Sequence, residues 1–173
     1  RRWRHYVMRF QQLTSPLMAK GFEDTFLYTY NRLVSLNEVG GDPRTFGIEP
    51  ERFHAFLNRR LARWPGALNA TATHDTKRGE DVRARLNVLS ELPQEWERQV
   101  RRWMRLNARR RRERQGRHLP SRNDEYFLYQ TLVGAHPLGA EPWPAFVERI
   151  QAYMLKSVRE AKVHTAWIKP DET

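Results

Sequence analysis

The chain has 173 residues, no cysteine and a formal net charge of +11, from 31 Lys and Arg against 20 Asp and Glu. The lack of cysteine excludes disulfides, thiolate zinc sites and a cysteine nucleophile, and no apolar run reaches the roughly 18–20 residues of a membrane-spanning helix. Hydrophobic residues make up 39% of the chain, which is enough to bury a core. The chain starts without Met and without the apolar stretch of a signal peptide, so we expect a cytoplasmic protein and a piece of a longer chain.

The first 66 residues are predicted to be helices joined by loops. Apolar residues recur at helical spacing from Trp3 to Phe10 and predict a short amphipathic helix. Residues 22–36 carry a similar pattern and predict a second helix, and Gly40–Pro43 predicts a loop. Pro50 is placed to open a third helix, which the Pro65–Gly66 pair ends.

The segment 67–73 differs from its surroundings. Its small apolar residues alternate with polar ones, which is the one convincing strand pattern in the chain. A lone strand leaves its backbone N–H and C=O groups without partners. Either this segment is an extended loop, or its partner strands lie outside the chain.

The remaining residues are predicted to be almost entirely helical. Helical spacing of apolar residues predicts a helix over 82–89, another from Pro93 onward, and a last and longest one over 146–161. Between them, a helix is predicted from an N-cap at Asn123 to a stop at Gly134. The fold is therefore expected to be mainly α, with at most one or two short strands.

Most of the net charge lies between Arg101 and Arg122, where ten arginines accompany one acidic residue, Glu113. One interpretation is a groove for single-stranded nucleic acid with Trp103 as a stacking surface. A second is a helix with an arginine-rich solvent face that frays near Gly116, because Trp103 follows the helical spacing of core positions. That spacing favours the second interpretation. A third is that the segment Arg101–Arg122 docks an acidic protein partner.

Most of the residues that directly follow the segment 67–73 have polar or charged side chains. Loops at strand ends carry the chemistry of many α/β folds. Asp75 lies beside His74, with Lys77 and Arg78 close by, and such a group can bind a polyhydroxy ligand through charge-assisted hydrogen bonds.

A helix start explains the same segment equally well. Thr73 or Thr76 would be the N-cap, with Glu80 and Asp81 in the first helical turn. The six histidines show no spacing typical of metal ligands, so we expect no metal site.

Five blocks of the sequence together resemble the maltooligosyltrehalose synthase family. In chain order these blocks are 18–25 (MAKG followed by EDT), 30–43 (YNRLVSLNEVGGDP), 73–85 (THDTKRGEDVRAR), 123–132 (NDEYFLYQTL) and 159–170 (REAKVHTAWIKP). They span most of the chain in the order that the family shows. This combination is far more specific than any single motif.

The resemblance implies a segment of an α-amylase-like (β/α)8 barrel enzyme. Residues 1–66 would be a helical segment with acceptor-side loops, 67–81 a barrel strand end with the active-site loop, and 82–173 a helical subdomain packed with 1–66. The implied reaction converts the reducing-end α-1,4 bond of a maltooligosaccharide, or of a glycogen-derived glucan, into an α,α-1,1 bond. It is a retaining intramolecular transglucosylation and needs no cofactor.

The resemblance also assigns residues. Asp75 matches the carboxylate that follows a histidine in the family's His-Asp motif, and its implied role is to hold sugar hydroxyls and support the oxocarbenium-like transition state. His74 would hydrogen-bond the same sugar. Further substrate-binding residues that the resemblance implies are Lys77, Arg78, Lys20, Glu23 and Asp24.

Two motifs of the family are missing from the 173 residues. They are the motifs that carry the carboxylate nucleophile and the Glu acid/base, so the chain holds one of three catalytic carboxylates. We therefore expect the isolated chain to be inactive, because both nucleophilic and acid/base catalysis are lost. Its expected partners are the glucan and the remainder of the catalytic barrel, with no membrane and no nucleic acid.

Overall fold

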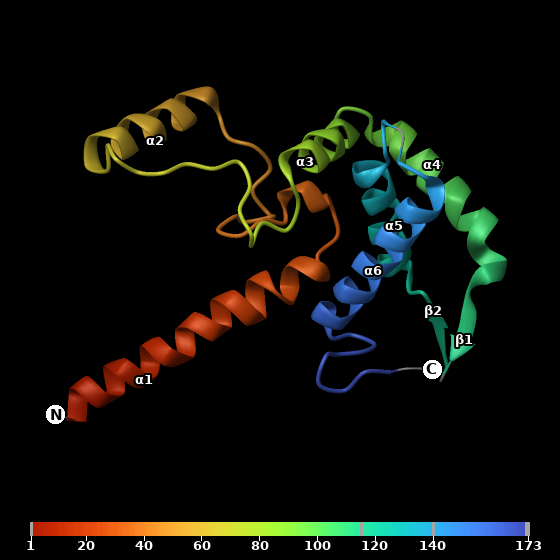
Figure 1. Ribbon diagram of the computed structural model, residues 1–173, viewed down its shortest axis with the longest axis horizontal. Helices are drawn as coiled ribbons and strands as arrows, with labels where there is room; N and C mark the ends of the chain where they lie inside the picture. Colours follow the sequence, from red (N-terminus) through yellow and green to blue (C-terminus); the bar gives the residue numbers. More distant parts are fainter. Residues whose placement is uncertain (1, 115, 140, 172–173) are drawn as a thin grey trace.

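The structure, a computed structural model, describes residues 2–114, 116–139 and 141–171. Helices α3 to α6 gather on one side of the molecule, and α1 and α2 project on the other (Figure 1). The described residues form six α-helices, short helical turns and one two-stranded sheet. The expected mainly α fold with at most one or two short strands is confirmed.

The two projecting helices contribute no buried residue. Helix α1 (Arg2–Pro16) continues into a π-helical segment, η1 (Leu17–Glu23), and α2 spans Pro50–Arg63. Pro50 occupies the first turn of α2, where its missing N–H costs no helical hydrogen bond. Both helices were expected from the spacing of their apolar residues. Those residues, such as Trp3 and Phe56, remain exposed.

The helix predicted over 22–36 is absent. The structure has two single 3-10 turns there, η2 (Phe26–Tyr28) and η3 (Val34–Leu36). A buried side-chain amide replaces the missing helical hydrogen bonds, because Asn37 Nδ2 donates to the carbonyl oxygens of Leu27 and Tyr30, each at 2.7 Å. The apolar residues of this segment are therefore buried without a helix.

The core lies where this irregular segment meets the later helices. These helices are α3 (Glu80–Asn87, followed by the 3-10 turn η4, Val88–Ser90), α4 (Pro93–Asn107), α5 (Arg122–Ala135) and α6 (Trp143–Ala161). Tyr28, Val34, Leu86 and Phe127 form the buried cluster.

A single side chain of α5 ties the irregular segment to the helices. Gln130 is fully buried, and its Oε1 accepts from the Val34 N–H at 2.9 Å while its Nε2 donates to the Asn31 carbonyl at 2.8 Å. Buried polar backbone needs such partners. This contact spans nearly a hundred residues of sequence and fixes the segment from which the candidate site is built.

Helix α5 begins and ends slightly differently from the prediction. Its N-cap is Ser121 rather than Asn123, and Ser121 and Asp124 form a reciprocal capping box that satisfies two orphan donors. Gly134 lies inside the helix, which runs on to Ala135. There Gly134 is buried against α3, so it serves helix packing and does not end the helix.

The arginine-rich segment is helical only in its first part, where Arg101, Arg102 and Arg105 lie on the solvent face of α4 as expected, and it does not fray into a loop afterwards. Helix α4 stops at Asn107, and after the turn η5 (Ala108–Arg110) the chain forms a hairpin of β1 (Arg112–Arg114) and β2 (Arg117–Leu119). The strands are antiparallel, with Arg112 opposite Leu119. Gly116 takes a positive φ of 72° in the turn, a conformation that favours glycine.

The segment 67–73 pairs with no strand among the residues that the structure describes. It is an exposed loop that leads from α2 towards α3. An unpaired loop agrees with both alternatives that the sequence left open, because partner strands outside the chain would not be seen here, so the barrel strand end at 67–81 stays a prediction.

Candidate functional site

The His-Asp motif lies in an exposed loop just before α3. Thr73 and Thr76 bond to each other, with the Thr76 hydroxyl donating to the Thr73 carbonyl at 2.8 Å and accepting from the Thr73 N–H at 3.2 Å. Neither caps a helix, because Gly79 is the N-cap of α3 and contributes no side-chain hydrogen bond. His74 and Asp75 are exposed in this loop, and the Asp75 side chain is 59% exposed.

Lys77 joins this loop to the segment around Asp24. Its side chain is only 6% exposed, and its Nζ lies 2.9 Å from Asp24 Oδ1 and 4.0 Å from Asp75 Oδ1. The ammonium group also lies over the Tyr28 ring, 5.9 Å from its centroid, within cation–π range. The structure thus brings together three of the residues that the sequence placed at the site.

Two more predicted residues lie next to this group. Lys20 forms an ion pair with Asp24 one helical turn away, and Glu23 Oε1 accepts from the Gly40 N–H at 3.2 Å. Partial burial of Asp24 works to raise its pKa, but the hydrogen bonds from Lys20 and Lys77 outweigh it and lower the pKa below the ordinary value of 3.8. The hydrogen bond to Asp24 correspondingly raises the pKa of Lys20.

Arg78 lies on the inner side of the loop. It is 8% exposed, its Nη1 donates to the Val34 carbonyl at 3.2 Å, and its guanidinium lies 5.3 Å from the centre of the Phe127 ring. Its side chain points into the protein, whereas Asp75 faces solvent. These contacts anchor the loop to the core.

Glu38 is a residue of the site that the sequence did not single out. Its carboxylate accepts from the backbone N–H of Lys77 at 2.9 and 3.1 Å, and from the Arg78 N–H at 3.5 Å. Arg83 Nη1 lies 3.5 Å from the same carboxylate. The one available signal was its place within the block 30–43, which resembles the synthase family.

The exposed arginines lie along α4 and the hairpin. Several make no side-chain hydrogen bond or ion pair with any residue that the structure describes, Arg102, Arg105 and Arg117 among them. Trp103, in contrast, packs against Trp96 and Tyr129 with ring centroids 5.9 and 5.2 Å away. It is therefore not a free stacking surface for nucleic acid. The acidic-partner hypothesis for Arg101–Arg122 stays a prediction.

No group of three or more potential metal-ligating side chains is found within the described ranges. The candidate site comprises the exposed Asp75 and His74 together with the Lys77–Asp24 ion pair. Charged groups of both signs in hydrogen-bonding reach of solvent suit a ligand with many hydroxyl groups.

Comparisons with known proteins agree on one family. A Mycobacterium tuberculosis protein (strain H37Rv) with the provisional name maltooligosyl trehalose synthase is 39% identical over 165 residues, which are 95% of this chain and 20% of that protein. The solved maltooligosyltrehalose synthase of Arthrobacter ramosus is 42% identical with a TM-score of 0.79, over 95% of this chain and 20% of its own. The chain matches one segment of the maltooligosyl trehalose synthases.

A hypothetical maltooligosyl trehalose synthase from Sulfolobus tokodaii is also 42% identical, with a TM-score of 0.81 over 95% of this chain and 21% of its own. No family model matches the sequence. The chain spans about a fifth of the length of these synthases. The resemblance to the maltooligosyltrehalose synthase family is confirmed, and the comparisons do not support the nucleic-acid alternative. None of the helices in the described ranges is long and apolar enough to cross a membrane.

Proposed function

We propose that this chain supplies one carboxylate, Asp75, to a maltooligosyltrehalose synthase active site. That site would convert the reducing-end α-1,4 bond of a maltooligosaccharide into an α,α-1,1 bond by intramolecular transglucosylation. The observation that carries the proposal is the Asp75 carboxylate, which is exposed on an anchored loop within a segment that matches synthases over nearly its whole length.

Asp75 is suited to hold sugar hydroxyls in the transition state. Its nearest cationic group, the Lys77 ammonium, lies 4.0 Å away, beyond ordinary hydrogen-bond length. The oxygens of Asp75 therefore keep their capacity to accept hydrogen bonds from substrate. The carboxylate also opposes the positive charge that develops on an oxocarbenium-like sugar.

The remaining predicted residues fall into two groups. His74 is exposed beside Asp75 and is proposed to bond the same sugar, and Lys20, Glu23 and Asp24 line the adjoining segment on the proposed acceptor side. Lys77 links the two through its ion pair with Asp24. For Arg78 we propose an anchoring role, because its guanidinium bonds Val34 and faces Phe127.

Grafting the chain into a relative tests this function. Residues 1–173 would replace the matching segment of the Arthrobacter ramosus synthase, and trehalose-ended product from maltopentaose would be measured. We expect the graft to be active and Asp75→Asn to lower its kcat by about 10²–10³, the effect of losing preorganised electrostatic stabilisation. Glu91→Gln, at an exposed carboxylate outside the site, serves as the matched control.

Two outcomes would contradict the proposal. One is a folded graft that forms no product, and the other is a kcat for Asp75→Asn within tenfold of the parent graft. The chain of 173 residues alone is expected to form no trehalose-ended product, because it lacks the motifs of the nucleophile and the acid/base. Product from the chain alone would overturn that expectation.

A further inference from the structure

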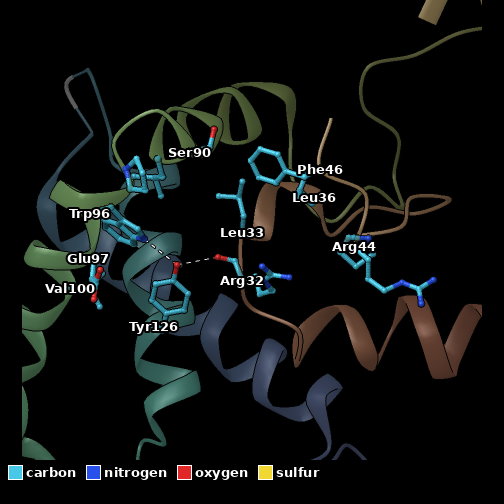
Figure 2. A pocket seen from close by; sticks show the side chains of 13 residues that line it. Arg32, Leu33, Leu36, Arg44, Phe46, Ser90, Trp96, Glu97, Val100 and Tyr126 are labelled. Carbon is cyan, nitrogen blue, oxygen red and sulfur yellow. Dashed lines mark hydrogen bonds between the residues drawn. The ribbon is translucent and has the colours of Figure 1, made fainter. Parts of the chain in front are cut away.

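A pocket of about 550 Å³ lies between the segment around η3 and helix α4. Figure 2 shows Trp96 and Tyr126 on one side of it, Phe46 and Arg44 on the other, and Leu33 between them. This volume is in the range of small-ligand sites. The pocket shares no lining residue with the loop of Asp75 or with the Lys77–Asp24 pair.

The aromatic wall of the pocket is held by a chain of hydrogen bonds. Trp96 Nε1 donates to the Tyr126 hydroxyl at 3.1 Å, and that hydroxyl donates to the Arg32 carbonyl at 3.0 Å (Figure 2). The Trp96 and Tyr126 rings lie 6.0 Å apart. Because both rings are fixed before any ligand arrives, binding against them costs little ordering entropy.

The charged groups at the pocket are largely neutralised by their neighbours. Arg44 is held by Asp42, with Nη2 2.8 Å from Oδ2, and Glu97 is paired with Arg101 at 2.6 Å. A phosphorylated ligand would need an excess of positive charge. With these two groups paired, Arg32 is the one cation of the described lining without an acidic partner. A single guanidinium favours a ligand with many hydroxyl groups over one with several negative charges.

Among the lining residues, Arg32 and Phe46 have the side chains that are most accessible for contact with a ligand. Arg32 is exposed, and its guanidinium donates to the Tyr30 hydroxyl at 3.3 Å and to no other side chain among the described residues. Phe46 is 67% exposed. An aromatic face combined with an exposed guanidinium suits a pyranose, whose C–H face packs on rings while its hydroxyls accept hydrogen bonds.

We propose that this pocket is a second binding site for an α-1,4-glucan chain, formed by Trp96, Phe46 and Arg32. The choice of glucan rests on the proposed function, whose substrate is a polymer of glucose. A long chain that occupies this pocket and the Asp75 region together would be retained by multivalency, without any new contact at the reacting bond.

The test measures binding and not rate. The graft described above would carry Asp75→Asn, and its migration in gels that contain increasing amounts of amylose would give an apparent Kd. Arg32→Ala and Phe46→Ala are each expected to raise that Kd by about fivefold, the scale of one stacking or charged contact. The matched controls are Arg102→Ala and Phe53→Ala, which change exposed residues of the same types outside the pocket.

The outcomes separate this inference from the proposed function. If Arg32→Ala and Phe46→Ala both leave the affinity for amylose unchanged, the second site is refuted. This conclusion does not depend on whether the graft with an intact Asp75 is active. An inactive graft whose amylose affinity still depends on Arg32 and Phe46 would refute the proposed function and keep the glucan site. Release of amylose by inorganic phosphate would show an anion site and overturn the inference.

Discussion

Glu38 and Lys77 are 39 positions apart, yet both oxygens of the Glu38 carboxylate accept from the Lys77 backbone N–H, at 2.9 and 3.1 Å. A carboxylate that receives N–H donors at one edge acts as a clamp on the backbone. Since Lys77 follows Asp75 by two residues, the position of the proposed catalytic carboxylate depends on a side chain from another segment.

Glu38→Gln is expected to loosen this loop. The substitution keeps one carbonyl oxygen and turns the other into an NH2 donor that faces backbone N–H groups and Arg83, so about 1–3 kcal/mol of folding free energy would be lost. Amide hydrogen exchange should become faster at Lys77 and Arg78, and urea unfolding gives the free energy. Glu95→Gln, at an exposed side chain, should change neither quantity. Unaltered exchange at Lys77 would contradict the clamp.

The lowered pKa of Asp24 makes its contribution to stability depend on pH. Because its pKa is lower in the folded state than the ordinary 3.8, the unfolded state holds more protons at this site near that pH. The stabilisation is therefore complete above pH 3.8 and is lost as pH falls through the folded pKa. Urea unfolding of the unmodified chain and of Asp24→Asn, measured at several pH values, would give the free energy of unfolding as a function of pH.

At about pH 7 Asp24→Asn should lower the free energy of unfolding by about 3 kcal/mol, because the nearly buried Lys77 ammonium loses its partner. At about pH 3 the difference in free energy of unfolding between the two proteins should become smaller, because Asp24 is then increasingly protonated and resembles Asn. Asp81→Asn supplies a control at an exposed carboxylate that forms no ion pair within the described ranges. A difference in free energy of unfolding that is the same at both pH values would argue against the ion pair between Lys77 and Asp24.

Arg78→Lys tests whether this arginine anchors the loop. Lysine keeps the charge but lacks the planar fork that bonds the Val34 carbonyl and faces the Phe127 ring, and the two side chains are not equivalent at such a site. We expect a loss of about 1–3 kcal/mol in unfolding free energy. Arg102→Lys, on the solvent face of α4, should stay within about 0.5 kcal/mol. Equal stability of the two variants would refute the anchoring role.

The sequence predicted those elements whose determinants are local. Helices α3 and α6 follow from apolar spacing, and α2 from Pro50 at its start and the Pro65–Gly66 pair after its end. The resemblance pointed to Asp75 and to the residues around Lys77. The irregular segment 24–38 was missed because its apolar residues fit a helix as well as they fit the core. What decides its conformation is the contact of Gln130 with Asn31 and Val34, which no local pattern contains.

The β1–β2 hairpin and the role of Glu38 were not predicted, for a related reason. Half of residues 112–119 are charged, and the segment lacks the β-branched and aromatic residues of typical strands. The turn glycine, Gly116, also fits the frayed end of a helix. Glu38 is one acidic residue among twenty. Its role follows only from the backbone groups that the fold brings to it, and those belong to another segment.

Gly134→Ala tests the close contact between α5 and α3. An added Cβ would lie 2.8 Å from Val82 Cγ1 and 3.2 Å from Leu86 Cγ, both within the packed core. The better helix propensity of alanine would return up to about 1 kcal/mol, whereas forcing a methyl group into a packed core costs about 1–3 kcal/mol. We therefore expect a net loss of about 1 kcal/mol in urea unfolding. Gly139→Ala, where nothing lies within 4 Å of the added Cβ, should change little. A Gly134→Ala protein more stable than its parent would show that α3 and α5 can separate at this point without loss of core packing.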